Sequence, residues 1–130
     1  MIIKARSISQ GKAEGFALVS KKPISFYGDV DKKTGIIINK KSDIYMESLK
    51  GKILIFPYSI GSTVGSWVIY ALKRNNVAPS AIIVDKADMI LASGCLISEI
   101  PLLDKPEKDL KNLVKNGDYI KIFDDTIILG

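Results

Sequence analysis

The chain has 130 residues, 47% of them apolar and 25% charged, with a formal net charge of +5. This length predicts one domain with its own hydrophobic core, and the apolar runs are of strand length, well below the roughly 18 residues of a membrane span. The sequence contains no histidine, which excludes a Ser-His-Asp or Cys-His catalytic group, a histidine metal ligand and a phosphohistidine within this chain.

The N-terminal part of the sequence is rich in strand patterns. Alternating apolar residues predict one strand over Ile2–Ser9 and a second over Glu14–Ser20. A short third strand is expected over Ile24–Phe26, after a turn that contains Pro23. The segment Gly28–Gly35 is dense in turn-forming residues and is expected to be a structured loop.

The middle of the chain has a strand–helix–strand pattern. An apolar strand over Lys52–Phe56 precedes a helix that is expected to begin at Ser62 or Thr63. The apolar face of this helix has the spacing i, i+3, i+4 and consists of Val64, Trp67, Val68, Ala71 and Leu72. The continuous apolar segment Ala81–Val84 predicts a buried strand, and the whole unit predicts a parallel pair joined by a right-handed crossover.

The C-terminal part returns to strand patterns. Asp88–Ser93 fits either a short helix or a loop, and Cys95–Ile97 is expected to be a brief strand. The remaining expected elements are an extended segment over Ile100–Asp104, one or two helical turns within Glu107–Val114, and a hairpin of Tyr119–Phe123 and Thr126–Leu129. Together these patterns favour the α/β class, as a layered β/β/α sandwich that forms a single domain over residues 1–130.

Charge and cysteine usage indicate the setting. The lysines occur in scattered pairs among acidic residues, which indicates a solvated surface and not a nucleic-acid-binding one. The start of the sequence lacks the order of a signal peptide, and the one cysteine, Cys95, fits a reducing cytoplasm. Its apolar neighbours predict a small buried side chain. Asp29 and Asp31 form a D-x-D pair without EF-hand spacing, so they are expected to cap their own loop.

The turn between the Lys52–Phe56 strand and the following helix is the best candidate for a functional site. It contains Pro57, several serines and two glycines, and such small residues let the backbone approach a ligand closely. The first amides of a helix favour negative charge. Gly61, Ser62 and Thr63 are therefore predicted to hold an anion.

Ser62 has two interpretations from the residues alone. As a helix N-cap, its oxygen would accept a hydrogen bond from an amide one turn on. As a catalytic group, it fits neither the G-x-S-x-G elbow nor a Walker A loop, and a triad is excluded by the lack of histidine. The catalytic interpretation that remains is a serine activated by backbone amides and by a metal-bound substrate.

Several segments, taken in order, resemble the swivel domain, or small subunit, of the aconitase X family. The likeness covers nearly the whole chain, and a run of spaced segments is far more specific than any one of them. The matching segments are Gly11–Gly15, Ala17–Ser20, Pro23–Phe26, Gly28–Asp31, Thr34-Gly35, Gly51–Pro57, Gly61–Ser66, Ala78–Ile83, Ile100-Pro101 and Asp104.

The resemblance implies a hydro-lyase that is active only as a heterodimer with a large aconitase X-type subunit. That subunit would carry a [4Fe-4S] cluster, and Ser62 would be the proton acceptor. The implied reaction removes water from (R)-mevalonate 5-phosphate to give trans-anhydromevalonate 5-phosphate, in an alternative mevalonate route to isoprenoids. The alternatives are dehydration of cis-3-hydroxy-L-proline by the same kind of enzyme, or a non-catalytic module that binds small anions.

The chain departs from ordinary aconitases after the serine. Those enzymes have an arginine nearby, whereas Thr63 and Val64 follow here, and the only arginines are Arg6 and Arg74. The cation that anchors the substrate is therefore expected from the large subunit or from a lysine. We expect the large subunit to cover an exposed, apolar or mildly basic face around Tyr58, Ile60 and the Gly28–Gly35 loop.

Overall fold

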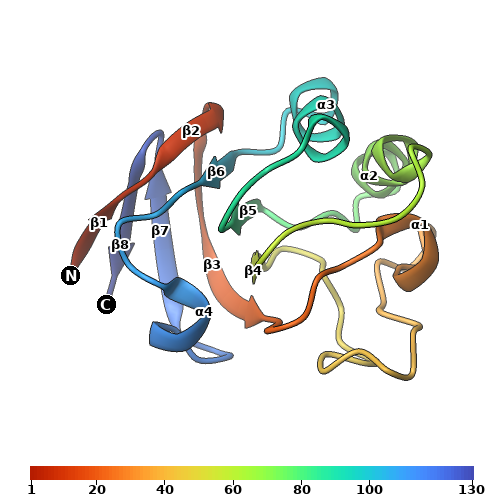
Figure 1. Cartoon of the computed structure of the whole chain (residues 1–130), viewed down its shortest axis with the longest axis horizontal. Helices are drawn as coiled ribbons and strands as arrows, with labels where there is room; N and C mark the ends of the chain where they lie inside the picture. Colours follow the sequence, from red (N-terminus) through yellow and green to blue (C-terminus); the bar gives the residue numbers. More distant parts are fainter.

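The computed structural model describes residues 1–130 and arranges them in two layers of strands and one layer of helices (Figure 1). The strands are β1 (Ile2–Lys4), β2 (Arg6–Ser9), β3 (Lys12–Val19), β4 (Ile53–Phe56), β5 (Ala81–Val84), β6 (Leu102–Asp104), β7 (Tyr119–Phe123) and β8 (Thr126–Leu129). The helices are α1 (Phe26–Asp29), α2 (Gly65–Arg74), α3 (Met89–Ser98) and α4 (Leu110–Leu113). None of them has the length and apolar character needed to cross a membrane.

The strands form one almost closed sheet in the order β1-β8-β7-β3-β4-β5-β6-β2. The pairs β3–β4, β4–β5 and β5–β6 are parallel, and the other pairs are antiparallel. Strand β3 joins the two layers, because its first residues pair with β7 and its last residues, from Ala17 on, pair with β4. The parallel pair predicted around the middle helix is therefore confirmed.

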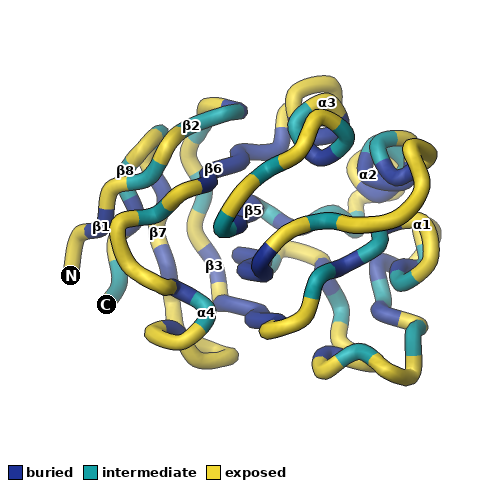
Figure 2. The backbone as a smooth tube through the Cα atoms, viewed as in Figure 1, coloured by how far each residue is buried: buried dark blue, intermediate teal, exposed yellow.

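The core has two parts, one on each face of the parallel strands. Leu54, Phe56 and Ile82 pack toward α2 and α3 in a cluster of 18 buried residues. Ile53 and Ile83 face the other way, in a cluster of 13 buried residues that includes side chains of β1, β7 and β8. Figure 2 shows the buried residues concentrated in these strands and the exposed ones in the loops. The predicted β/β/α sandwich of the α/β class is confirmed.

Two predictions for the N-terminal part are wrong in detail. The first strand is divided at Ala5, because β1 pairs with β8 at one end of the sheet and β2 pairs with β6 at the other. The expected strand over Ile24–Phe26 is reduced to a single parallel bridge between Ile24 and Ser59, since Ser25 is the N-cap of helix α1 and Phe26 is its first residue. Ser25 caps this helix: its Oγ accepts from the Gly28 N–H at 3.2 Å, and the Ser25 N–H donates to Asp29 Oδ2 at 2.9 Å.

The expected strand over Cys95–Ile97 lies inside helix α3, which resolves Asp88–Ser93 as the start of a helix. Asp88 caps it by accepting from the Leu91 N–H at 2.8 Å. Gly94 lets α3 pack closely on α2, since a β-carbon there would lie 2.8 Å from Ile69 Cδ1. Cys95 is fully buried, as predicted, and burial raises the pKa of its thiol to about 12.

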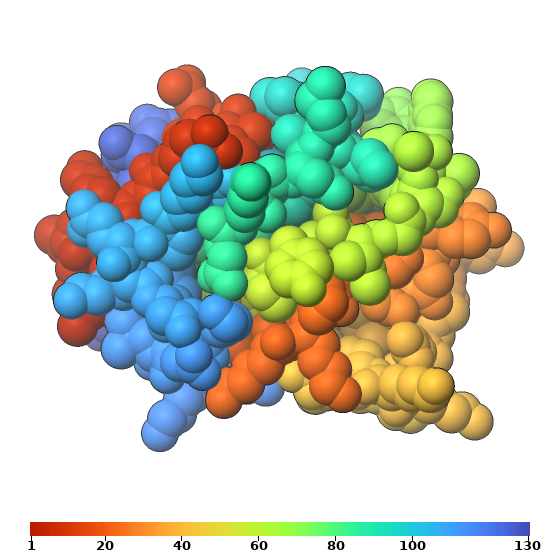
Figure 3. Space-filling view, viewed as in Figure 1, coloured from red at the N-terminus to blue at the C-terminus, as the bar shows by residue number.

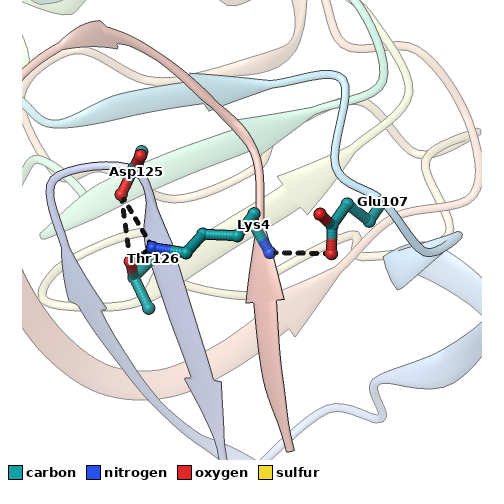
Figure 4. Close-up of polar contacts among 4 residues, drawn as sticks. All are labelled: Lys4, Glu107, Asp125 and Thr126. Atoms are coloured by element: carbon teal, nitrogen blue, oxygen red, sulfur yellow. Dashed lines mark hydrogen bonds and ion pairs between the residues drawn. The ribbon is translucent and has the colours of Figure 1, made fainter.

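Lys4, at the end of β1, fastens this strand to two distant segments (Figure 4). Its Nζ donates to Thr126 Oγ1 at 2.8 Å and to Asp125 Oδ1 at 3.4 Å, both at the turn of the C-terminal hairpin. Its backbone N–H donates to Glu107 Oε2 at 3.4 Å, and the Glu107 N–H donates to the Lys4 carbonyl at 2.9 Å. Lys4 therefore attaches the N-terminal strand both to the C-terminal hairpin and to the segment before α4.

An ion pair between Arg6 and Asp104 closes the opposite end of the sheet. Nε and Nη2 of Arg6 donate to the two carboxylate oxygens at 2.8 Å each, and the Ala87 N–H also donates to Oδ2 at 2.9 Å. Burial alone would raise the pKa of Asp104, but the hydrogen bonds from Arg6 and Ala87 outweigh it and hold that pKa below its usual value.

We therefore expect Asp104→Asn to lower the free energy of unfolding at pH 7 by about 1–3 kcal/mol, because a neutral amide replaces the buried carboxylate that accepts charge-assisted hydrogen bonds from Arg6. A depressed folded-state pKa stabilises the fold above the unfolded pKa of roughly 4, and this stabilisation disappears as the pH falls through the folded pKa. Urea unfolding at pH 7 and pH 3 should show the difference between variant and parent shrinking at the lower pH. Asp125→Asn, at the exposed Lys4 pair, is the control with little effect. An equal loss at both pH values would contradict the prediction.

Candidate functional site

The candidate site lies at the carboxyl ends of the parallel strands. The segments that follow β4, β5 and β6 leave the sheet at these strand ends, where ligands usually bind in open α/β sheets. The Asp85 N–H donates to the Pro57 carbonyl at 2.9 Å, and the Lys105 N–H donates to the Asp85 carbonyl at 3.0 Å. Figure 3 shows these segments side by side on the face turned to the viewer.

Residues Pro57–Val64 connect β4 to α2 and are called the serine loop below. Its first half is attached to the segment before α1: the Ile24 N–H donates to the Tyr58 carbonyl at 3.3 Å, and the Ile60 N–H donates to the Ile24 carbonyl at 3.1 Å. Gly61 follows with a φ of +95°, and a β-carbon there would lie 2.5 Å from Ser25 Oγ. Only glycine therefore suits this turn.

Ser62 is exposed, and its hydroxyl bonds forward along the chain, to the amide two residues on. Its Oγ accepts from the Val64 N–H at 3.1 Å, and its carbonyl accepts from the Gly65 N–H at 3.0 Å. The N–H groups of Gly61, Ser62 and Thr63 donate no hydrogen bond within the chain. The site thus presents a hydroxyl and three free amides at one exposed turn.

The predicted start of the helix is wrong, and so is the N-cap interpretation of Ser62. Helix α2 begins at Gly65, and its N-cap is Val64, which makes no side-chain cap. Ser62 stabilises the turn that precedes the helix, because its Oγ and its carbonyl oxygen accept hydrogen bonds from the N–H groups of Val64 and Gly65. The expected apolar face is also rotated: Val64 and Trp67 are 43% and 69% exposed, while Ile69 is buried. Gly65 is buried, and a β-carbon there would lie 3.6 Å from Ile90 Cγ2 and 3.9 Å from Phe26 Cβ, so this side of α2 faces inward.

A small pocket adjoins Ser62. Ser59 and Asp88 are its other polar side chains, and its volume of about 10 Å³ is roughly that needed for one water molecule. Phe26, Ile60, Gly65, Ile69, Ile90 and Leu91 complete its lining. A much larger recess, of about 1080 Å³, is lined by Gly51, Ser80 and Pro101 at the amino ends of the parallel strands, and so at the other edge of the sheet from Ser62. This chain alone therefore does not enclose a substrate around Ser62.

Exposed apolar side chains lie in the serine loop and in the first turns of α1, α2 and α3, and we call them the apolar rim. Trp67 and Met89 are the most exposed, at 69% and 81%. The complete rim is Tyr27, Tyr58, Ile60, Val64, Trp67 and Met89. Tyr58 and Ile60 were expected on such a face. Six large apolar side chains exposed around one turn are typical of a surface that a partner covers.

The Gly28–Gly35 loop has only partly the predicted structure and place, because Gly28 and Asp29 are the last residues of helix α1 and the turn comes after them. It begins beside Ser25, and its far end lies against the C-terminal end of α2, where Asn75 Nδ2 donates to the Lys32 carbonyl at 2.9 Å. Only the beginning of the loop adjoins the apolar rim. As expected, Asp29 accepts from the Ser25 N–H and Asp31 from the Lys33 N–H, so both aspartates cap local turns.

Neither arginine is a free cation at the serine loop. Arg6 is paired with Asp104, and Arg74 lies in the last turn of α2, at the other end of the helix from Ser62. Cys95 does not fit a cluster ligand, because its thiol is fully buried and its raised pKa disfavours the thiolate. No group of three or more Asp, Glu or Cys side chains converges on a metal position in the chain.

Ser59 and Asp88 were not among the predicted site residues. Ser59 Oγ donates to Asp88 Oδ1 at 3.1 Å, so the serine loop is joined to the start of α3. The pattern that could have identified Asp88 is an acidic residue just before an apolar run, which is typical of a helix N-cap. Nothing in the local sequence pattern relates it to Ser59.

Nearly the whole chain is similar to known proteins. Residues 2–129 match the model of the aconitase X swivel domain. The phosphomevalonate dehydratase small subunit of Methanosarcina mazei is 50% identical over 119 residues, which cover 92% of this chain and 83% of that protein. The protein of the same name from Thermococcus kodakarensis is 58% identical over 104 residues, which cover 80% and 78%.

Two solved structures are similar over the whole chain. The crystal structure of Thermococcus kodakaraensis aconitase X in its holo-form has a TM-score of 0.95 and 47% identity, and the match covers 100% of this chain and 98% of that one. The solution NMR structure of a UPF0107 protein has a TM-score of 0.89 and 42% identity, with 100% and 99% covered.

Proposed function

This chain belongs to the aconitase X swivel-domain family, and from that premise we propose that it is the small subunit of a cytoplasmic dehydratase for (R)-mevalonate 5-phosphate. The observation that carries the proposal is the similarity of nearly the whole chain to proteins named phosphomevalonate dehydratase small subunit. The product is trans-anhydromevalonate 5-phosphate, in an alternative mevalonate route to isoprenoids. This chain forms one swivel domain over residues 1–130.

Ser62 is the proton acceptor in this proposal. The proton to be removed lies on the carbon next to the substrate carboxylate and is weakly acidic, so a strong base is required. The hydrogen bond from the Val64 N–H to Ser62 Oγ, at 3.1 Å, favours the deprotonated oxygen, since a donor stabilises the charged form. The carbon–hydrogen electron pair then forms the double bond as the neighbouring hydroxyl leaves.

Gly61 and Thr63 bind the substrate through their backbone in this proposal. Their N–H groups are free and lie on either side of Ser62. Free amides held in one turn stabilise negative charge that develops on a bound anion. A substrate with a carboxylate and a phosphate supplies two such charges. Because no arginine is free at this edge, a lysine or the large subunit neutralises the second charge.

The large subunit completes the site. The pocket beside Ser62 holds roughly one water molecule, whereas ligand pockets usually measure about 300–1,000 Å³. The substrate therefore binds between the serine loop and a second protein surface, which the apolar rim is suited to contact. We place the [4Fe-4S] cluster on that subunit, where an iron would act as a Lewis acid on the leaving hydroxyl.

The proposed function is tested with the reconstituted heterodimer. We expect the two chains together to dehydrate (R)-mevalonate 5-phosphate, and this chain alone to be inactive, because it does not enclose the substrate. Product formation is followed by mass spectrometry under anaerobic conditions, with cis-3-hydroxy-L-proline as the competing substrate. Turnover of cis-3-hydroxy-L-proline but not of (R)-mevalonate 5-phosphate would show that the proposed substrate is wrong. Failure of the chain to bind any large subunit, with anion binding retained, would support an anion-binding module instead.

A further inference from the structure

Two polar side chains next to Ser62 have no role in the proposed mechanism. They are Ser59 and Asp88, and both line the small pocket with Ser62. Ser59 Oγ donates to Asp88 Oδ1 at 3.1 Å, and the same oxygen accepts from the Leu91 N–H at 2.8 Å. One carboxylate oxygen thus caps helix α3 and also holds the serine loop.

The contact completes a two-sided attachment of the serine loop. On one side, Ile24 binds the loop through its backbone, to the Tyr58 carbonyl and from the Ile60 N–H. On the other side, Asp88 binds Ser59, which lies between those two residues. Beyond Ile60, the hydrogen bonds of the loop to other segments go only to the start of α2, where the Gly65 N–H donates to the Ser62 carbonyl at 3.0 Å and Ser66 Oγ donates to the Thr63 carbonyl at 3.3 Å. The place of Ser62 therefore depends on α2 on one side and on how residues 58–60 are held on the other.

Asp88 is itself anchored to a rigid part of the fold. The N–H of the preceding residue, Ala87, donates to Asp104 Oδ2 at 2.9 Å. Asp104 is fully buried at the end of β6, and Arg6 binds both of its oxygens. A run of hydrogen bonds and covalent neighbours therefore leads from Asp104, at the end of β6, through Ala87 and Asp88 to Ser59.

We propose that Asp88 is a positioning residue that acts through Ser59 to fix the serine loop. This inference rests on the proposed function for its effect on turnover. A reacting group displaced by about 1 Å can lose roughly a hundredfold in rate, because the near-attack geometry is lost. The two roles of Asp88 can be separated, since Ser59→Ala removes the loop contact and leaves the α3 cap in place.

The test is a double-mutant cycle in the reconstituted heterodimer. We expect Ser59→Ala to lower kcat by about ten- to a hundredfold, with KM and melting temperature nearly unchanged. Asp88→Ala should lower kcat by the same factor and also lower the melting temperature, because the cap is lost. The double variant should lose no further kcat, and Ser59→Thr, which keeps the hydroxyl, should restore it. Losses that multiply in the double variant, or parental kcat in Ser59→Ala, would overturn the proposal.

A second measurement does not depend on the reaction. The amide heteronuclear NOE of Ser62 and Thr63, measured on the full chain by NMR, should fall in Ser59→Ala and in Asp88→Ala by similar amounts. Unchanged values would overturn the positioning role even if kcat falls. If the parent heterodimer dehydrates no substrate, the proposed function fails, and the NOE decides the positioning role by itself.

Discussion

Replacing Ser62 with alanine is expected to lower kcat of the reconstituted heterodimer by at least about a hundredfold, the lower limit for loss of a general base. The hydroxyl is exposed, and it supports one amide at the turn, that of Val64. The free energy of unfolding should therefore change by about 0.5 kcal/mol or less. Assembly with the large subunit should be unaffected. The measurements are anaerobic turnover of (R)-mevalonate 5-phosphate and thermal unfolding of the same preparations.

Ser93→Ala is the matched control, since Ser93 is an exposed serine of α3 whose side chain donates and accepts no hydrogen bond within the chain. It should leave both kcat and melting temperature at the parental values. Near-parental turnover in Ser62→Ala would show that the hydroxyl only stabilises its turn. A large fall in melting temperature together with lost turnover would attribute the effect to folding and not to proton transfer.

Trp67→Glu is expected to weaken assembly with the large subunit by about thirtyfold or more, the effect of removing an interface residue worth about 2 kcal/mol and adding a charge. Trp67 is 69% exposed in the first turn of α2, beside the serine loop. The fold itself should tolerate the change, because an acidic residue in the first turn suits the helix dipole. Calorimetric titration of the large subunit gives the Kd.

Ile128→Glu is the control for this assembly prediction. Ile128 is exposed on β8, within the antiparallel part of the sheet that the helices do not cover, and it pairs with Lys121 across the strands. Its replacement should leave the Kd unchanged. The opposite result, weakened assembly for Ile128→Glu and not for Trp67→Glu, would move the docking face to the sheet. Trp67 is the only tryptophan, so fluorotryptophan labelling gives one fluorine NMR signal, which should shift when the subunits assemble.

The sequence by itself determined those elements whose pattern is local. Strand β5 and the hairpin of β7 and β8 have their predicted bounds, and β4 differs by one residue, because a continuous or alternating apolar run marks a strand without reference to its neighbours. The burial of Cys95 also follows from adjacent apolar residues. The family resemblance, which rests on spaced segments, likewise needed no structure.

Only the tertiary structure decided the elements whose sequence fits more than one secondary structure or more than one packing arrangement. Helix α3 is apolar around most of its circumference, so its sequence lacks the periodicity that separates a helix from a strand, and packing on α2 through Gly94 settles it. In the same way, the exposure of Trp67 depends on which side of α2 faces the sheet.

The surroundings of Ser62 belong to this second group. Ser59 and Asp88 are 29 residues apart, and Arg6 and Asp104 are 98 apart. Local propensity carries no information about pairs at such separations, because many polar side chains could serve equally well in the unfolded chain. The order of the strands brings these two pairs together, and so it is the sheet that decides where the serine loop is held.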